Sequence, residues 1–207
     1  MISEDELSNL YQYRYKNVLI IIASKLENNI KELLIDYPRI DRISARAKLP
    51  DSFIRKAYIK KEGDFLKYSE PLSQIQDQIG VRVITFYKSD VEPICQHLKE
   101  YLAPIEEQLI IPDSVKEFGY EGKHLVLFIP KEFITPDLAK EHCPTFFELQ
   151  IVTLFEHAWA EANHDLAYKP QSELNSDQRR KVAFTAAQAW GADYIFDQLV
   201  IELARKI

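Results

Sequence analysis

Two carboxylates in strand-like segments are the residues best suited to chemistry on a phosphate ester. Asp77 precedes GVRVITFY, and Glu148 lies within FFELQIVT. An acidic residue that faces a cleft from the start of a strand commonly holds Mg²⁺, which prefers hard oxygen ligands. A second carboxylate could bind a second metal ion or accept the proton of an attacking hydroxyl group. Taken singly, each acid fits an ion pair with a neighbouring Arg equally well.

The segment 39–61 is strongly basic, with eight Lys and Arg residues against two acidic residues. Arg46 and Lys48 are two positions apart on an expected strand, so their side chains share one face. Lys56 follows on a helix expected to begin near Ser52, whose free N–H groups could bind phosphate. Taken alone, such a run is more often a solvated basic face than a binding site.

An aromatic residue at the tip of an expected loop could bind a base. Gly119 and Tyr120 precede the expected strand 123–129, and His124 lies at its start. Stacking of a base on an aromatic ring contributes ~1–3 kcal/mol. Core packing explains one Tyr among 11 equally well.

Polar residues recur along one face of an expected helix over 154–168. His157, Glu161, His164 and Tyr168 fall at helical spacing, which permits metal ligation. The pattern HxxxExxH lacks the HExxH arrangement of zinc proteases. A polar seam that hydrogen-bonds neighbouring loops is the favoured interpretation.

The elements that must position these residues can be read from hydrophobic periodicity. Helices are expected over 4–36, 52–62, 90–102, 154–168 and 176–206, and strands over 40–49, 80–87, 105–111, 123–129 and 145–153. This order predicts an α+β fold, a mixed β-sheet flanked by helices, with long N- and C-terminal helices. In the last helix, a stripe of Ala183, Ala187, Trp190 and Tyr194 is expected to be buried, by packing or in a subunit contact rather than in a cofactor site.

Composition narrows the class of protein. The 207 residues carry a net charge of -6, which argues against general nucleic-acid binding. The two cysteines form no CxxC motif, and the polar N-terminus does not resemble a signal peptide. The apolar run 18–23 is too short to span a bilayer. We expect a soluble cytoplasmic protein that makes no membrane contact.

Four motifs in order over residues 38–170 resemble the synthetase domain of the RelA/SpoT family, which makes the alarmone (p)ppGpp. The matching residues are Arg46, Lys48, Ser52, Phe53 and Lys56; Asp77 and Arg82; Gly119, Tyr120 and His124; and Glu148, Gln150, Thr153, His157, Trp159, His164, Tyr168 and Lys169. The resemblance implies one domain of nucleotidyltransferase type over 1–207. Its core would be 38–170, with helical extensions 1–37 and 171–207. The chain resembles small, synthetase-only members.

The implied reaction transfers pyrophosphate from ATP to the 3′-hydroxyl of GDP or GTP and releases AMP. Asp77 and Glu148 would be the catalytic and Mg²⁺-binding residues. The implied ATP-binding residues are Arg46, Lys48, Ser52, Lys56 and Arg82. The implied acceptor-binding residues are Tyr120, His124, Gln150, His157 and His164.

Two departures from the family pattern leave the acceptor open. Val152 stands where the family has Arg, and Gly122 where it has Ser. A toxin-type relative would act on tRNA, through a basic patch such as Lys60 and Lys61 or residues 179–181, and would have an antitoxin partner. An adenine nucleotide acceptor and a non-catalytic, nucleotide-binding member are further alternatives. A homo-oligomer built through the first and last helices and packing within one subunit both stay open.

Overall fold

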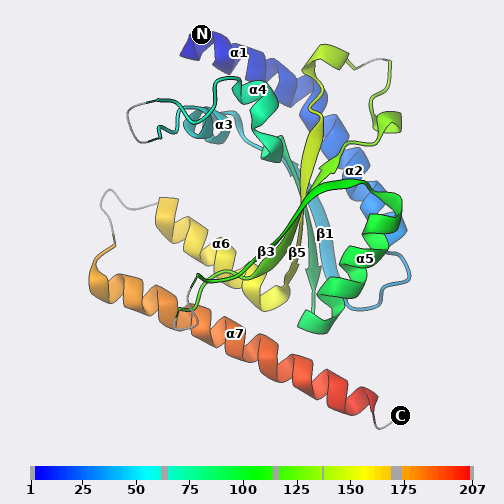
Figure 1. The fold of residues 1–207 in the computed structure, drawn as a ribbon, viewed down its shortest axis with the longest axis vertical. Coiled ribbons are helices and arrows are strands. Elements are labelled where there is room, and N and C mark those ends of the chain that lie inside the picture. The colour runs from blue at the N-terminus through cyan, green and yellow to red at the C-terminus, as the bar shows by residue number, and fades with distance from the viewer. Residues whose placement is uncertain (1–2, 62–64, 114–116, 137, 169–173, 206–207) are drawn as a thin grey trace.

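The computed structural model describes residues 3–61, 65–113, 117–136, 138–168 and 174–205 (Figure 1). The strands are β1 (Ile40–Ala47), β2 (Ile79–Thr85), β3 (Pro104–Ile110), β4 (Gly122–Phe128) and β5 (Phe146–Thr153). The helices are α1 (Glu4–Arg14), α2 (Ile20–Leu33), α3 (Pro50–Ala57), α4 (Pro71–Gln74), α5 (Val91–Tyr101), α6 (Leu154–Tyr168) and α7 (Ser176–Ala204). None of the helices within these ranges is long and apolar enough to cross a membrane.

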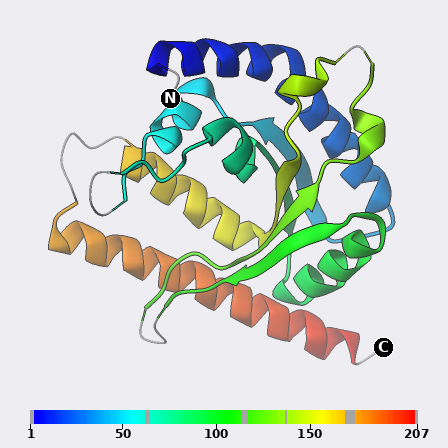
Figure 2. The same ribbon diagram turned by 45° about the horizontal axis from the view of Figure 1, so that its top comes forward.

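The strands form one sheet in the order β1-β2-β5-β4-β3. β2 and β5 are parallel, and every other neighbouring pair is antiparallel, which confirms the predicted mixed sheet. Alternate residues of each strand point to opposite faces. Val81, Val83, Leu149 and Ile151 are buried on one face, in a core shared with residues of α2 and α5. These two helices pack against the sheet (Figure 2). The opposite face is therefore the one available for polar side chains.

The N-terminal helix is a single rod with a widened turn. Ser3 caps α1, and three acidic residues in its first turn complement the helix dipole. A π-helical turn, Tyr15–Leu19, then joins α1 to α2. Tyr11, Val18 and Ile22 fall on one face of this rod and are fully buried. The π turn holds one extra residue, so the buried face of the helix shifts around the helix axis at this point. A search for a 3.6-residue period does not reveal this shift.

The boundaries around the basic segment differ from the predicted ones. β1 ends at Ala47, whereas Leu49 was the expected end, and α3 begins at Pro50 rather than near Ser52. Proline suits this first helical position because it has no N–H to leave unpaired. The phosphate-facing helix start predicted at Ser52 is therefore wrong by two residues. Short α4 and the 3₁₀ turn Gln76–Gln78 were not predicted.

The stripe predicted to be buried in α7 is not fully buried within this chain, because only Ala187 and Trp190 of it are half-buried. Ala186 and Asp193 are the buried residues of this helix, whereas Ala183 is exposed and Tyr194 is 48% exposed. The helix packs along α6 (Figure 2). Large apolar side chains lie on more than one side of α7, including exposed Phe184, Ile195 and Leu203, so hydrophobic periodicity could not select the contact face.

Candidate active site

The register of the sheet brings distant motifs into one row. Arg82 on β2 is paired with Gln150 on β5, and Gln150 is paired with His124 on β4. Residues that are partnered across strands point to the same face. Arg82 Nε donates to Gln150 Oε1 at 3.0 Å. Three of the motifs found in the sequence therefore meet on one face of the sheet.

A second row holds an open position between a cation and a carboxylate. Gly80 is paired with Arg46 on one side and with Glu148 on the other. A Cβ added at Gly80 would have no heavy atom within 4 Å. Among the described residues, no side chain therefore fills the space immediately above Gly80, between Arg46 and Glu148, and a ligand could approach the backbone there.

Glu148 is held as an anion by two neighbours. His124 Nδ1 lies 2.8 Å from Glu148 Oε1. Burial alone would raise the pKa of Glu148, but the hydrogen bonds from His124 and Gln150 outweigh it, so the pKa lies below its usual value. The carboxylate is ionised at neutral pH and can accept a proton or a metal ion.

Asp77 forms ion pairs with two lysines of the basic segment, Lys48 and Lys56. Its Oδ2 lies 3.0 Å from Lys48 Nζ and 2.9 Å from Lys56 Nζ. Burial opposes ionisation, but the two ammonium groups prevail and lower the pKa of Asp77. Its other oxygen, Oδ1, is buried and has no hydrogen-bond partner among the described residues. This orphaned oxygen is suited to a hard cation.

The N-terminal helix fixes this lysine cluster in place. Tyr11 stacks on Phe53 of α3 with ring centroids 3.7 Å apart, and its hydroxyl donates to the Lys48 carbonyl at 2.9 Å. Buried Arg14 donates to Gln78 Oε1 at 2.9 Å, beside Asp77. The sequence motifs did not indicate these supports, because each contact joins segments that are far apart along the chain.

Arg82 is bound to both the sheet and α6. Its Nη1 lies 2.9 Å from His157 Nδ1 and 2.5 Å from Glu161 Oε1. Burial and then the Arg82 charge lower the pKa of His157, which favours a neutral imidazole. His157 and Glu161 of the predicted polar seam therefore bind Arg82 on β2, whereas neighbouring loops were the expected partners.

The remaining predicted residues lie at the margins of this face. Arg46 is exposed on β1. Ser52 lies in the first turn of α3 and accepts a hydrogen bond from Arg55 Nη2 at 3.3 Å. His164 is exposed on α6, beyond His157 and Glu161. Lys169 and the side chain of Tyr168 lie outside the described residues.

A pair of buried acids behind the site was not predicted. Glu156 and Asp193 are 2% and 1% exposed. Glu156 Oε2 accepts from the Glu121 N–H at 3.2 Å, and Asp193 Oδ2 accepts from the Thr153 hydroxyl at 2.5 Å. Burial, followed by weaker charge effects, raises the pKa of Glu156 to about 7 and that of Asp193 to about 6. These acids connect α7 with the loop that carries Tyr120.

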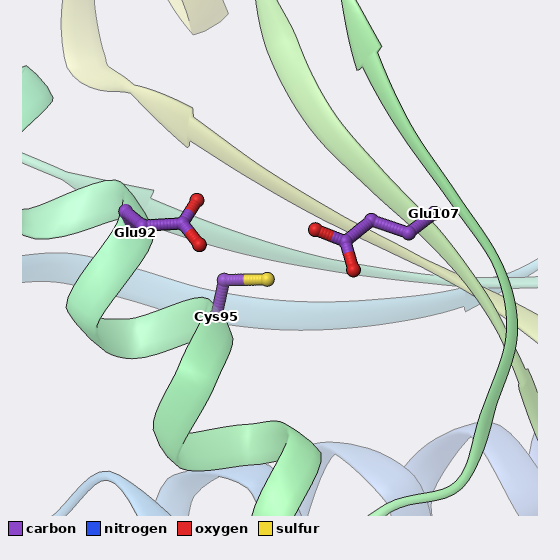
Figure 3. Close-up of side chains that lie close together, drawn as sticks. All are labelled: Glu92, Cys95 and Glu107. Carbon is purple, nitrogen blue, oxygen red and sulfur yellow. The ribbon is translucent and has the colours of Figure 1, made fainter.

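Among the described residues, one group of three potential metal ligands was found. It consists of Glu92 and Cys95 of α5 and Glu107 of β3, whose side chains face one another (Figure 3). Lys123 Nζ already lies 3.1 Å from Glu92 Oε2 and 2.5 Å from Glu107 Oε1. Burial raises the pKa of the Cys95 thiol, which opposes metal binding. Lys123 alternates with His124, so this ion-pair cluster lies on the opposite face of the sheet from the candidate site.

Most of the chain matches one family of known proteins. Residues 45–173 match the family model described as the region found in RelA / SpoT proteins. The chain is 21% identical over 210 residues to the GTP pyrophosphokinase YwaC of Bacillus subtilis (strain 168), covering 100% of this chain and 93% of that protein.

Solved structures share the fold. A GTP pyrophosphokinase family protein from Streptococcus pneumoniae superposes with a TM-score of 0.74 at 22% identity, covering 91% of this chain and 92% of that one. Small alarmone synthetase 1 from Bacillus subtilis, bound to its product pppGpp, gives a TM-score of 0.71 at 21% identity, with coverage of 93% and 95%. Because the family model matches more than half of its length, the chain belongs to the RelA/SpoT family.

Proposed function

We propose that the protein transfers the β,γ-pyrophosphate of ATP to the 3′-hydroxyl of GDP or GTP, making (p)ppGpp. The observation that carries the proposal is an ionised Glu148 on the same sheet face as Arg82, with an open surface above Gly80 beside it. The names of the relatives, a GTP pyrophosphokinase and an alarmone synthetase bound to pppGpp, support the same reaction.

The chemistry explains why these residue types are needed. Glu148 accepts the proton of the 3′-hydroxyl, whose oxygen attacks the β-phosphorus of ATP. The bond from that phosphorus to the oxygen bridging the α-phosphate breaks, and AMP leaves with the electron pair. The transferred group is highly charged, so catalysis depends on positioning and on cations. Lys48 and Lys56 would bind the ATP phosphates, together with Ser52, and Arg46 and Arg82 would bind the adenine.

The residues fit a magnesium ion. Asp77 offers a buried oxygen that has no partner among the described residues, and Glu148 offers a second hard carboxylate. When bound, Mg²⁺ would neutralise charge on the phosphates of ATP. We propose Asp77 and Glu148 as its protein ligands.

The names of the relatives support a guanine nucleotide as the acceptor. The remaining motif residues are proposed to bind it, by their position in the motifs. Tyr120 would stack on the base, and Gln150, His124, His157 and His164 would lie around the acceptor. The proposal also implies a cytoplasmic protein, because its substrates are cytoplasmic nucleotides.

A labelling experiment tests the proposal. Purified protein is incubated with Mg²⁺ and γ-labelled ATP, separately with GDP, GTP, ATP and deacylated tRNA, and the products are resolved. Label transferred to a guanine nucleotide is the expected result. Label on tRNA or on an adenine nucleotide, with none on a guanine nucleotide, would overturn the assignment of the acceptor. No transfer of label, despite ATP binding, would overturn the proposal that the protein is a catalyst.

A further inference from the structure

A chain of two hydrogen bonds leads from an aromatic hydroxyl to the proposed base. The Tyr120 hydroxyl lies 2.8 Å from His124 Nε2, and His124 Nδ1 lies 2.8 Å from Glu148 Oε1. We infer that Tyr120 and His124 are positioning residues for Glu148, and that the Tyr120 hydroxyl selects the His124 tautomer that holds the carboxylate. The inference rests on the proposed function of Glu148 and goes beyond acceptor binding by Tyr120 and His124.

The direction of the protons follows from the two ends of the chain. As the proposed base, Glu148 carries no proton and its oxygens only accept, so His124 donates to it through Nδ1 across the 2.8 Å contact. A neutral imidazole with its hydrogen on Nδ1 is an acceptor at Nε2. The Tyr120 hydroxyl, 2.8 Å from that nitrogen, can then donate to it. One tautomer therefore satisfies all three groups.

The absence of a side chain at Gly122 makes room for this arrangement. A Cβ at Gly122 would come 2.5 Å from the Tyr120 hydroxyl oxygen and 2.9 Å from Val152 Cγ1. Such distances are shorter than carbon contacts allow, so the tyrosine would have to move. Gly122 and Val152, the two departures from the family motifs, thus lie next to each other, and Gly122 permits the inward position of the Tyr120 side chain.

The geometry divides the roles of the tyrosine between ring and hydroxyl. The rings of Tyr120 and His124 meet edge to face, with centroids 5.6 Å apart at 76°. The hydroxyl is hydrogen-bonded to the imidazole, while the ring is proposed to contact the base of the ligand. A free carboxylate can rotate about its side-chain bonds, and restraining one oxygen orients the other for in-line proton acceptance. Fixing the base in this way should raise the rate of the transfer step and leave the affinity for the guanine nucleotide nearly unchanged.

Tyr120→Phe tests the hydroxyl while keeping the ring. In single-turnover assays with labelled ATP and guanine nucleotide, the rate of transfer should fall about three- to tenfold, the scale of one lost hydrogen bond. The KM for the guanine nucleotide should change by less than about twofold. An unchanged rate, or a loss confined to KM, would overturn the inference.

His124 variants test the second bond. In His124→Asn the amide nitrogen can replace Nδ1 as a donor to Glu148, so this variant should be faster than His124→Ala. Adding Tyr120→Phe to His124→Asn should cost nothing further, because the hydroxyl no longer acts through an imidazole. Fully additive losses would contradict a relay.

Gly122→Ala tests the relay without removing any hydrogen-bonding group. Its Cβ should displace the Tyr120 hydroxyl and lower the transfer rate as Tyr120→Phe does. Gly119→Ala is the matched control in the same loop, because a Cβ there meets only Pro112 Cγ, at 3.7 Å. Equal rates in the two alanine variants would count against the role of Gly122.

A measurement without turnover separates the relay from the proposed function. The ¹⁵N chemical shifts of the His124 imidazole should report hydrogen on Nδ1 and none on Nε2, and Tyr120→Phe should disturb that state. Hydrogen on Nε2 in the unaltered protein would overturn the relay whatever the activity. A protein that transfers no label to guanine would refute the proposed function alone, and normal transfer by Tyr120→Phe would refute the relay alone.

Discussion

Arg82 on β2 and Glu161 on α6 form an ion pair across the edge of the candidate site, with Nη1 and Oε1 2.5 Å apart. Gln150 and His157 hold the same guanidinium from other directions. Burial would raise the pKa of Glu161, but the bond from Arg82 lowers it, so the pair is ionised at neutral pH. A guanidinium fixed on several sides is preorganised to bind a flat ring or a phosphate.

Replacing Glu161 by Gln should loosen this preorganisation. We expect the KM for ATP to rise roughly two- to threefold, a modest effect because the pair is partly exposed and screened. In a double-mutant cycle, Glu161→Gln should have no further effect once Arg82 is replaced by Ala. Steady-state kinetics with ATP varied give the test, and fully independent effects would show that Glu161 does not act through Arg82.

Gly80→Ala should separate folding from substrate binding. The added Cβ meets no heavy atom within 4 Å, and alanine is not disfavoured relative to glycine in a strand. The midpoint of thermal unfolding should therefore stay the same or rise slightly, while transfer activity falls, because the methyl group occupies the surface between Arg46 and Glu148. Full activity in a stably folded Gly80→Ala variant would place the substrates elsewhere.

The buried acid Glu156 predicts a pH dependence of stability. Its pKa is raised from the ordinary value of 4.5 to about 7 in the folded protein. Its favourable contribution is complete below pH 4.5, where the unfolded chain is also protonated, and falls as the pH rises to 7, because the native state then holds a proton that the unfolded state has lost.

Glu156→Gln should therefore gain stability relative to the unaltered protein as the pH rises from 5 to 8. The expected difference is on the order of 1–3 kcal/mol. Urea unfolding at the two pH values measures it, with Glu132→Gln on the exposed surface as the control. Parallel pH profiles for Glu156→Gln and the unaltered protein would mean that Glu156 is not protonated when buried.

The sequence predicted the elements well because its strands alternate and its helices have clear apolar faces. Placing Glu148 and Gln150 on one strand face required only a period of two. The sequence did not indicate the bond from Arg14 to Gln78 or the proximity of Glu156 to Asp193, since each depends on how distant elements pack. The π turn and the contact face of α7 were also hidden, because neither follows from hydrophobic periodicity.

Asp77→Asn should abolish activity while preserving the fold. The amide keeps the size of the side chain but loses the charge that balances Lys48 and Lys56 and that would bind Mg²⁺. We expect turnover to fall by roughly two to three orders of magnitude, as for other preorganised electrostatic contacts. Calorimetric titration with Mg²⁺ in the presence of a non-hydrolysable ATP analogue should show weaker metal binding. Unchanged metal affinity would remove Asp77 from the proposed metal site.

The most direct test of the proposed reaction is to identify what remains of ATP after transfer to GTP, in the unaltered protein and in Glu148→Gln. Pyrophosphate transfer predicts AMP in equal amount to a labelled guanine nucleotide, and neither product from Glu148→Gln, although that variant still binds ATP. ADP in place of AMP, or undiminished turnover by Glu148→Gln, would contradict the account.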